Sequence, residues 1–388
     1  MSHFKITTLS LLLLLFLILS FDPHTPTENS GLSDNPEEIE TPIKDTIPSL
    51  LPTSVENTSE QKVTEASVES FFQSRVEKTT EMLSGTTSTT PPPANESLPT
   101  LEETPSISFS EINTLRRPAL INIFCTTDSG GFFRPISGSG VLIHEKGVIL
   151  TNAHVAQYFL LRNASSNQVT CTGRVGNPAK ATYLLEPLYI SPAWIEENAE
   201  SIVSENPLGT GEYDYALLAI TGTLQNATDL TLPLHVPLSN QKYTPPGTAV
   251  YIGGYPAGFI GGITIQKGLT ITSTVGTIDE VFTFKEDTPD LITVKGSILS
   301  QQGASGGAVI ASDGTLIGIV VTSTSADNTE ERVLGAITTD YIKRDFKRQT
   351  EIDLLDFLER DISTSVNNFK ENDSPILRDL LLEHLQQG

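Results

Sequence analysis

The stretch that decides the fold is GSGVLIHEKGVILTNAHV, residues 138–155. It contains two short apolar runs, VLI and VIL, separated by a polar segment with a glycine, and His154 follows the second run. Short runs rich in Val, Ile, Leu and Thr and bounded by turn residues are typical of antiparallel strands. The stretch therefore predicts two strands with a histidine at the end of the second.

The same texture continues in both directions, from about Ile107 to Tyr341. At least eight such runs are separated by Gly, Pro, Asn and Asp, and SDG at residues 312–314 is typical of a hairpin turn. The last run, VLGAITTDYI at residues 333–342, is expected to be strand throughout. With no Gly-rich βαβ unit among them, these runs predict an all-β domain, either a barrel or a sandwich.

Composition excludes several classes of protein. The 388 residues include 24 Lys and Arg against 47 Asp and Glu, a net charge of -23. This acidity argues against nucleic acid as a partner, because few cations are present to replace counterions along a phosphate backbone. Two cysteines exclude a four-thiolate zinc site. His144 and His235 have no Cys, His or carboxylate neighbours at ligand spacing, so we predict no metal and no cofactor.

An apolar run near the N-terminus predicts export. It extends from Ile6 to Phe21, after Lys5, and Asp22-Pro23 ends it. The run is long for a signal peptide and shorter than the ~20 residues of a spanning helix, and no small-x-small cleavage pattern follows it. We favour an uncleaved signal anchor over residues 1–21, with the membrane as partner and the remaining chain outside the cytoplasm. The alternative is a cleaved signal peptide and a secreted protein.

Residues 22–106 have the composition of a disordered linker. They contain 16 acidic and 4 basic residues, many Thr, Ser and Pro, and few large apolar groups to offset the entropy of ordering. Within them, the apolar residues of Glu60–Leu83 have helical spacing. The alternative to disorder for this segment is a transient helix or a docking segment. Four N-x-S/T triplets are glycosylation sites only if the host glycosylates exported chains; they begin at Asn57, Asn95, Asn163 and Asn226.

Three short segments carry candidate chemistry. TNAHV places His154 after an apolar strand, EYDYALLAI places Asp214 at the head of another strand where burial is expected, and QQGASGGAVI places Ser305 in a Gly-rich turn before a third strand. Taken singly, residues of these types at such places are usually structural. Their combination in the order His, Asp, Ser, with steps of 60 and 91 residues, is much more specific.

In this order and spacing the chain resembles the trypsin-like serine peptidases, most closely the HtrA-type branch, over roughly residues 118–345. The matching words are GSGVLI, GVILTNAHV, DYALL, GYPAG, GASGG and GTLIGIV, which begin at residues 138, 147, 214, 254, 303 and 314. The resemblance implies two six-stranded antiparallel β-barrels of the chymotrypsin-like kind in a protease domain over residues 107–345. A C-terminal helical tail over residues 346–388 is expected to follow.

The resemblance also implies a catalytic triad of His154, Asp214 and Ser305, with an oxyanion hole formed by the N–H groups of Gly303 and Ser305. A serine hydroxyl is a poor nucleophile, so a neutral imidazole must take its proton as it attacks a carbonyl carbon. A carboxylate holds the imidazole and stabilises the imidazolium, and the N–H groups bind the oxyanion. The predicted function is that of a serine endopeptidase acting through an acyl-enzyme on unfolded or extended polypeptides.

Two other functions are weighed against this one. The first is a catalytically silent exported module that binds peptides in the same groove, but such a protein has no physical need to keep all three side chains. The second is an esterase, because GASGG at residue 303 matches the letters of a nucleophile elbow. That elbow lies between a strand and a helix, whereas a strand is expected here on the far side, so the esterase is rejected.

The chain departs from the family pattern in two places. Ala304 stands where trypsin-like zymogens carry the Asp that captures a new N-terminus, and no IVGG-type sequence lies near Ile121, so activation by such a cleavage is not expected. About 45 residues follow Lys343, fewer than the PDZ domain that is usual in HtrA-type proteins needs. HtrA-type relatives often form trimers, but this sequence leaves the oligomeric state open.

The resemblance also indicates the residues of a specificity pocket. Leu299 is expected near its base, Val321, Thr322 and Ser323 on an edge strand that pairs with substrate backbone, and Val333 at the opposite wall. None is acidic, so a desolvated Lys or Arg of the substrate would find no partner. A small or medium apolar residue such as Val, Ala or Leu is therefore the predicted preference.

Two further predictions concern stability. Export makes Cys125 and Cys171 candidates for a disulfide, and two buried free thiols are the alternative. The C-terminal sequence predicts amphipathic helices. Ile352, Leu355, Phe357 and Leu358 are expected to pack on the barrel, with self-association or a partner helix as the alternative use, above all for residues 376–385.

Overall fold

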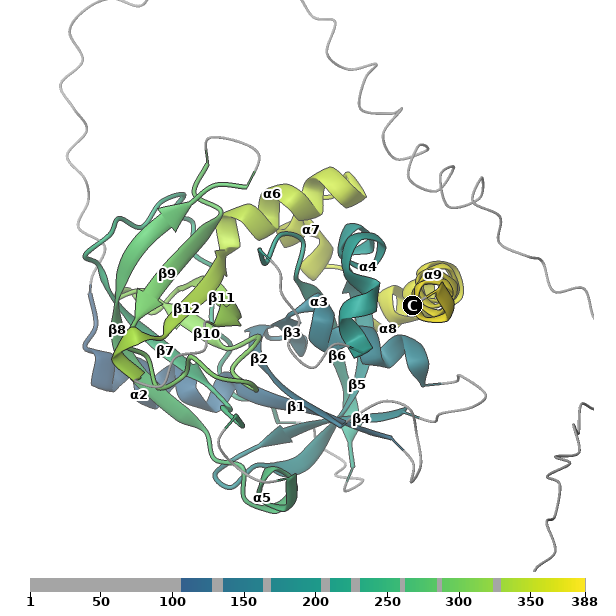
Figure 1. Cartoon of the computed structure of the whole chain (residues 1–388), viewed down its shortest axis with the longest axis horizontal. Coiled ribbons are helices and arrows are strands. Elements are labelled where there is room, and N and C mark those ends of the chain that lie inside the picture. Colours follow the sequence, from purple (N-terminus) through teal and green to yellow (C-terminus); the bar gives the residue numbers. More distant parts are fainter. Residues whose placement is uncertain are drawn as a thin grey trace, which may run out of the picture. The chain divides into compact units, whose positions relative to one another are not determined.

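Twelve strands close into two antiparallel β-barrels within the residues that the structure describes (Figure 1). The computed structural model describes residues 106–127, 135–162, 169–203, 210–224, 231–258, 262–284, 288–323 and 329–387. The predicted anchor, the linker up to residue 105 with its helical segment, and the four N-x-S/T asparagines lie outside these ranges. Among the helices so described, none combines the length and the apolar character needed to cross a membrane.

The quoted stretch lies in the first barrel, where it forms the hairpin of β2 and β3. The turn of this hairpin places Gly147 at a φ of 86°, and the Gly147 N–H donates to the His144 carbonyl (3.1 Å). All four residues of β3 are buried, as are most residues of β2. In order around the barrel, the strands are β1 (Leu120–Thr127), β2 (Ile136–His144), β3 (Val148–Thr151), β6 (Ala216–Thr223), β5 (Lys180–Ile190) and β4 (Val169–Val175).

The second barrel contains the Gly-rich turn. In order around it, the strands are β10 (Ala308–Ile310), β11 (Leu316–Ser323), β12 (Val333–Thr338), β9 (Leu291–Lys295), β8 (Thr272–Phe282) and β7 (Ala249–Gly254). The predicted hairpin at residues 312–314 is confirmed, since it joins the paired strands β10 and β11 and places Gly314 at a φ of 79°. Two six-stranded antiparallel barrels are thus confirmed, and the sandwich alternative is wrong.

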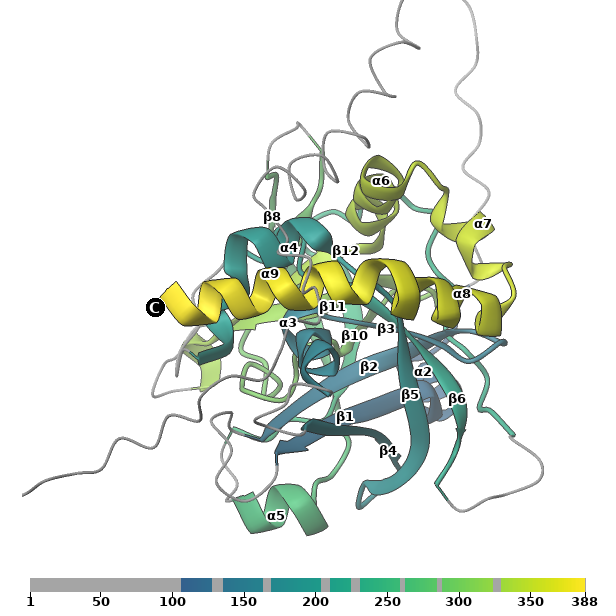
Figure 2. The same cartoon turned by 90° about the vertical axis from the view of Figure 1, so that its right-hand side faces the viewer.

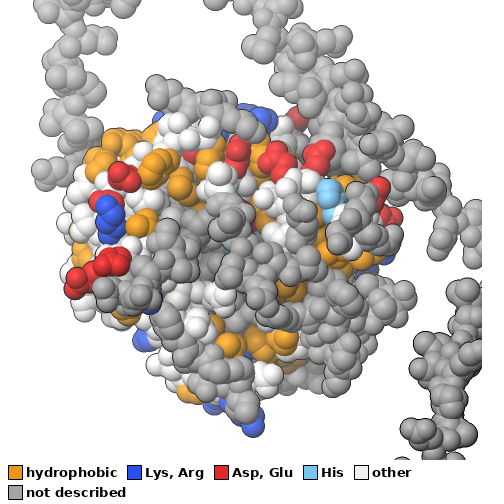
Figure 3. All heavy atoms as spheres, viewed as in Figure 1, with side chains coloured by type: hydrophobic (Ala, Val, Ile, Leu, Met, Phe, Trp, Pro, Cys, Tyr) orange, Lys and Arg blue, Asp and Glu red, His pale blue; other side chains and the backbone are white. Residues whose placement is uncertain are grey.

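Short helices precede, join and follow the strands. Acidic side chains are spread over the face shown in Figure 3, in line with the net charge of -23. Two helices precede the first strand, α2 (Phe109–Arg116) and η1 (Arg117–Ala119). The helices between strands are α3 (Ala153–Ala156), η2 (Gln157–Leu161), α4 (Pro192–Asn198), η3 (Ala199–Val203), α5 (Gly262–Lys267) and η4 (Thr329–Glu331). After the last strand come α6 (Thr339–Thr350), α7 (Leu354–Leu358), α8 (Ile362–Asn368), η5 (Phe369–Asp373) and α9 (Ser374–Gln387).

One strand prediction ran too far. The run at residues 333–342 was expected to be strand throughout, but β12 ends at Thr338 and α6 begins at the next residue. The Thr338 hydroxyl accepts a hydrogen bond from the Tyr341 N–H (3.1 Å), which is the N-cap arrangement that threonine favours. The cap starts a helix although β-branched residues surround it, because it satisfies an N–H group that the first turn leaves without a partner.

The C-terminal residues predicted to pack on the barrel are buried or packed against its core, with one exception. Leu358 is buried, and Ile352 and Phe357 pack against the core, but Leu355 is 52% exposed and lies on the outer face of α7. Leu377 and Leu381 of α9 are also buried, so these two leucines are used within the chain rather than for self-association. Figure 2 shows α9 lying along α4.

A disulfide joins Cys125 to Cys171. The two residues face each other directly in the pairing of β1 with β4, and both are buried. The bridge connects positions 46 residues apart in sequence. Because β1 and β4 are the neighbours that complete the ring of the first barrel, the bridge lies where that ring closes.

Replacing both cysteines tests how much the bridge stabilises the fold. We expect Cys125→Ala with Cys171→Ala to lower the free energy of unfolding by about 3–4 kcal/mol, because the unfolded chain regains the entropy that the cross-link removes. Urea unfolding of the oxidised wild type, the reduced wild type and the double variant measures this. Equal midpoints for the oxidised and reduced wild type would contradict the prediction.

Candidate active site

His154 lies in the first turn of the short helix that follows β3. Asn152 has extended backbone angles, which turn the chain from strand into helix at Ala153. The His154 Nδ1 lies 2.7 Å from Asp214 Oδ2, and the His154 backbone N–H donates to Asp214 Oδ1 (2.9 Å). A carboxylate oxygen accepts hydrogen bonds, so in the neutral imidazole Nδ1 is the nitrogen that carries the proton and Nε2 is the one that can accept one.

Asp214 is buried and its backbone is held on both sides. Asn152 Nδ2 donates to the Asp214 carbonyl (2.8 Å), and the Asp214 N–H donates to the Gly211 carbonyl (3.2 Å). The preceding residue, Tyr213, has a φ of 63°, a left-handed conformation that costs a non-glycine residue roughly 1–2 kcal/mol. Such strain persists only where the surroundings determine the conformation, which is common at functional sites.

Ser305 lies in the turn between β9 and β10, and a serine of the first barrel holds this turn. The Ser139 N–H donates to the Ser305 carbonyl (2.7 Å), and the Ser139 Oγ donates to the Gly303 carbonyl (2.7 Å). The same Oγ accepts from the Tyr255 N–H (2.9 Å). Ser139 belongs to the word GSGVLI, but its role could not be predicted, because a contact with a residue 164 positions further along the chain leaves no local signal in the sequence.

The Ser305 turn therefore lies against the strands that lead to His154. A Cβ built on Gly306, which has a φ of 82°, would lie 2.0 Å from the Ser139 carbonyl oxygen and 2.7 Å from Thr151 Oγ1. Thr151 is the last residue of β3, three positions before His154. The structure thus brings His154 and Asp214 into direct contact and packs the turn that carries Ser305 beside the end of β3.

The predicted oxyanion residues lie in a turn of the backbone, and Gly303 occupies a position in this turn where a side chain would not fit. Gly303 has a φ of 87°, and a Cβ there would lie 2.7 Å from the Tyr255 carbonyl oxygen and 2.8 Å from the Ala257 Cβ. Among the described residues, no acceptor receives the N–H of Gly303 or of Ser305. Within the described part of the chain, two N–H groups of this turn thus have no acceptor, as donors to a ligand oxygen must have none.

The predicted specificity residues are three apolar residues, which are buried or half-buried, and two residues whose backbone lies at the edge of β11. Leu299 and Val321 are buried, at 1% and 5% exposure, and Val333 is half-buried at the start of β12. The backbone of Thr322 and Ser323 pairs with β12, whereas β10 pairs with β11 only as far as Ile319, so from Val321 onward the described strands cover one edge of β11.

Trp194 is a site neighbour that the sequence analysis missed. It is the single tryptophan of the chain, it is buried in α4, and its ring centroid lies 6.4 Å from that of His154. The Ser191 hydroxyl caps α4 by accepting from the Trp194 N–H (3.3 Å). No pattern in PAWIEEN marks this residue, because its position depends on how the connection between β5 and β6 packs.

Comparison with known proteins identifies the domain. A family model described as the trypsin-like peptidase domain matches residues 138–319, which include His154, Asp214 and Ser305. The chain carries a trypsin-like peptidase domain. The domain over residues 138–319 is therefore of the serine endopeptidase kind, a class of hydrolase.

Solved structures with a similar fold include HtrA-type proteases. The HtrA-type protease AlgW with a decapeptide is 20% identical, with 62% of this chain and 67% of that chain covered and a TM-score of 0.40. The active form of the Rv3671c protease from M. tuberculosis is 19% identical, with 68% and 95% covered and a TM-score of 0.38. Among curated proteins, no sequence matches the chain.

Two glycines with nearly the same φ allow the cost of a steric clash to be distinguished from the cost of a strained backbone. Gly247 has a φ of 85°, but a Cβ there would meet nothing within 4 Å. We expect Gly247→Ala in the trypsin-like domain to lower the free energy of unfolding by about 1–2 kcal/mol, the cost of the left-handed conformation alone. Gly303→Ala should lower it further, because its Cβ also overlaps Tyr255 and Ala257.

Thermal or urea unfolding of the two variants measures the difference. A Gly303→Ala variant as stable as Gly247→Ala would show that the turn rearranges without cost, contrary to this expectation.

Proposed function

We propose that this trypsin-like domain cleaves peptide bonds through a triad of His154, Asp214 and Ser305. The observation that carries the proposal is the pair of hydrogen bonds that one buried carboxylate, that of Asp214, accepts from the backbone N–H and the ring of His154. They set the ring orientation and leave Nε2 as the proton acceptor. This is the arrangement that a serine nucleophile requires of its base.

The proposed reaction has two stages. His154 Nε2 takes the proton of the Ser305 hydroxyl as Oγ attacks the substrate carbonyl, and the N–H groups of Gly303 and Ser305 stabilise the oxyanion that forms. The imidazolium then gives its proton to the leaving amine, and the acyl-enzyme remains. Water, activated by the same imidazole, attacks the ester, releases the acid product and restores the Ser305 hydroxyl. Asp214 stabilises the imidazolium in both stages.

Extended polypeptides are the proposed substrates. An extended chain can hydrogen-bond to the edge of β11 from Val321 to Ser323 as an added strand, next to the Ser305 turn. The Gly306 N–H donates to the Val320 carbonyl (2.8 Å), which fixes the turn beside this strand. Leu299, Val321 and Val333 carry no charge that could compensate a desolvated Lys or Arg of the substrate, so we propose cleavage after a small or medium apolar residue instead.

We propose that the protein acts outside the cytoplasm, held by an anchor over residues 1–21 or released by cleavage of that segment. The disulfide between Cys125 and Cys171 supports this location, because such bonds persist in oxidising compartments. The alternative function, a silent module that binds peptides, uses the same edge of β11 without the chemistry.

Covalent labelling distinguishes the peptidase from the silent module. We expect a fluorophosphonate probe to label the full-length chain, because it phosphonylates a serine oxygen only where a base activates it. Ser305→Ala should abolish the label, and Ser300→Ala, which removes a buried serine from the segment just before the same turn, should keep it. Labelling that survives Ser305→Ala would refute the assignment, and an unlabelled wild type would favour the silent module.

The role of Asp214 is tested by an isosteric change. Asp214→Asn should lower kcat on a peptide substrate on the order of 10,000-fold, because an amide can hold the imidazole in the wrong tautomer. Asp290→Asn, which changes an equally buried carboxylate in the second barrel, serves as the control and should retain kcat. Near-normal turnover in Asp214→Asn would point to another carboxylate as the partner of His154.

A further inference from the structure

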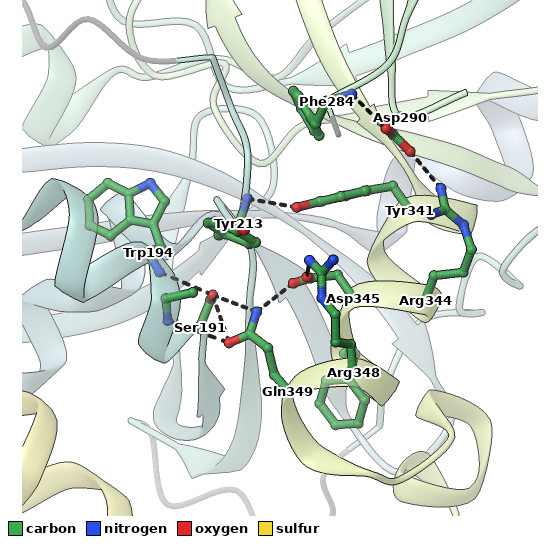
Figure 4. Close-up of polar contacts among 12 residues, drawn as sticks. Ser191, Trp194, Tyr213, Phe284, Asp290, Tyr341, Arg344, Asp345, Arg348 and Gln349 are labelled. Atoms are coloured by element: carbon green, nitrogen blue, oxygen red, sulfur yellow. Dashed lines mark hydrogen bonds and ion pairs between the residues drawn. The ribbon is translucent and has the colours of Figure 1, made fainter. Parts of the chain in front are cut away.

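The residues on both sides of Asp214 are held by one helix outside the barrels, α6. The Tyr213 N–H donates to the Tyr341 hydroxyl (3.1 Å), and the Tyr215 hydroxyl donates to Asp345 Oδ2 (2.7 Å). All four of these side chains are buried. Figure 4 shows Tyr341 and Asp345 reaching from α6 toward the segment that carries Tyr213. The carboxylate proposed for the triad thus sits between two anchors that both end on α6.

Asp345 is the centre of these contacts. Its side chain is fully buried, and it accepts hydrogen bonds from Tyr215, from the Arg348 guanidinium and from the Gln349 amide. A buried carboxylate costs several kcal/mol unless partners of this kind compensate it. Burial raises the pKa of Tyr215, and Tyr189 and Asp345 raise it further. The Tyr215 hydroxyl therefore stays protonated and remains a donor to Asp345.

The same helix also reaches the element beside His154. Gln349 Nε2 donates to the Ser191 Oγ (3.1 Å), and Ser191 caps the helix that places Trp194 near the His154 ring. The contacts of Gln349 with Ser191 are drawn in Figure 4. One turn of α6, from Asp345 to Gln349, therefore binds both the segment that carries Asp214 and the segment that carries Trp194.

The opposite face of α6 binds the second barrel. Arg344 pairs with Asp290 (2.6 Å), which lies just before β9, and Lys343 Nζ donates to the Ser239 carbonyl (2.8 Å). Asp290 is as buried as Asp345 and binds the same helix, but its hydrogen bonds lead to Phe284, Thr288 and Arg344 rather than to the neighbours of Asp214. The chain thus supplies, as a control, a buried carboxylate that binds α6 through Arg344 without a hydrogen bond to Tyr213 or Tyr215.

We propose that Asp345 is a positioning residue, which holds the Asp214 carboxylate against His154 by way of the Tyr215 hydroxyl. The proposal rests on the proposed function, because it assigns Asp345 to the alignment of that triad. If the Tyr215 contact is lost, the strained segment from Tyr213 to Tyr215 keeps its bonds to Tyr341 and Asn152 but loses one of its two anchors on α6. Misplacement of a reacting group by about 1 Å lowers the rate on the order of 100-fold.

The experiment compares variants of the full-length protein. Asp345→Ala should lower kcat on a peptide substrate on the order of 100-fold with KM changed little, because the substrate edge of β11 is untouched. Asp345→Asn keeps an oxygen that accepts from Tyr215 and should recover most of that loss. Tyr215→Phe removes one hydroxyl, keeps the ring and should lower kcat in the same direction. Asp290→Asn should lose stability comparable with that of Asp345→Asn and keep kcat.

The pH profile separates positioning from general destabilisation. The groups facing His154 are the Asp214 carboxylate and the Trp194 ring, and those facing Asp345 are Tyr215, Tyr341, Arg348 and Gln349. In Asp345→Ala the imidazolium is less well stabilised, so the acidic limb of kcat/KM should move to lower pH. Asp290→Asn should leave that limb in place. Fluorescence of Trp194 checks in each variant whether α4 has moved.

Each outcome has a definite meaning. If the wild type labels at Ser305 but Asp345→Ala and Tyr215→Phe keep the wild-type kcat and pH profile, the positioning role is overturned and the proposed function stands. If Asp345→Ala does not fold, Tyr215→Phe decides in the same way. If the wild type shows no Ser305-dependent labelling, the proposed function fails and the positioning role fails with it. A kcat loss in Asp290→Asn equal to that in Asp345→Ala would also overturn it.

Discussion

The site depends on the hydrogen bonds of one buried serine, Ser139, across the boundary between the barrels. Its N–H and hydroxyl bind two carbonyls of the Ser305 turn, and its hydroxyl also receives the Tyr255 N–H. Each bond contributes roughly 0.5–1.5 kcal/mol, but a buried group that loses its partner costs about 1–3 kcal/mol. The two barrels are therefore fixed to each other at the place where the proposed chemistry needs residues from both.

Asp214 shows how the protein holds a strained segment in place. The left-handed Tyr213 sets the direction of the backbone at the carboxylate, and its cost is offset by hydrogen bonds on either side. The first barrel contributes Asn152, and α6 contributes Tyr341 and Asp345. A segment held from two independent elements cannot relax without breaking contacts to at least one of them, which is what the preorganisation of a charged group requires.

The sequence predicted those features that are determined by residues close to one another along the chain. Apolar runs and turn residues gave the strands, and the words around His154 and Asp214 indicated two residues that the fold brings into contact. The end of β12 was missed, because the hydroxyl of Thr338 outweighs the strand preference of its neighbours. Ser139 and Trp194 were missed for another reason. Their roles arise from contacts between segments far apart in sequence, which a single chain of letters does not display.

The position of the disulfide bears on the order in which the molecule assembles. Both sulfurs and the strands that carry them lie before residue 176, whereas the carboxylate and hydroxyl of the proposed triad lie beyond it. A chain made from its N-terminus presents β1 through β4 first. In an oxidising compartment, the two thiols can be oxidised to the disulfide without any residue that follows β4 in the sequence. The disulfide can therefore form before β5, β6 and the second barrel are synthesised. These later parts can then fold onto strands that are already cross-linked.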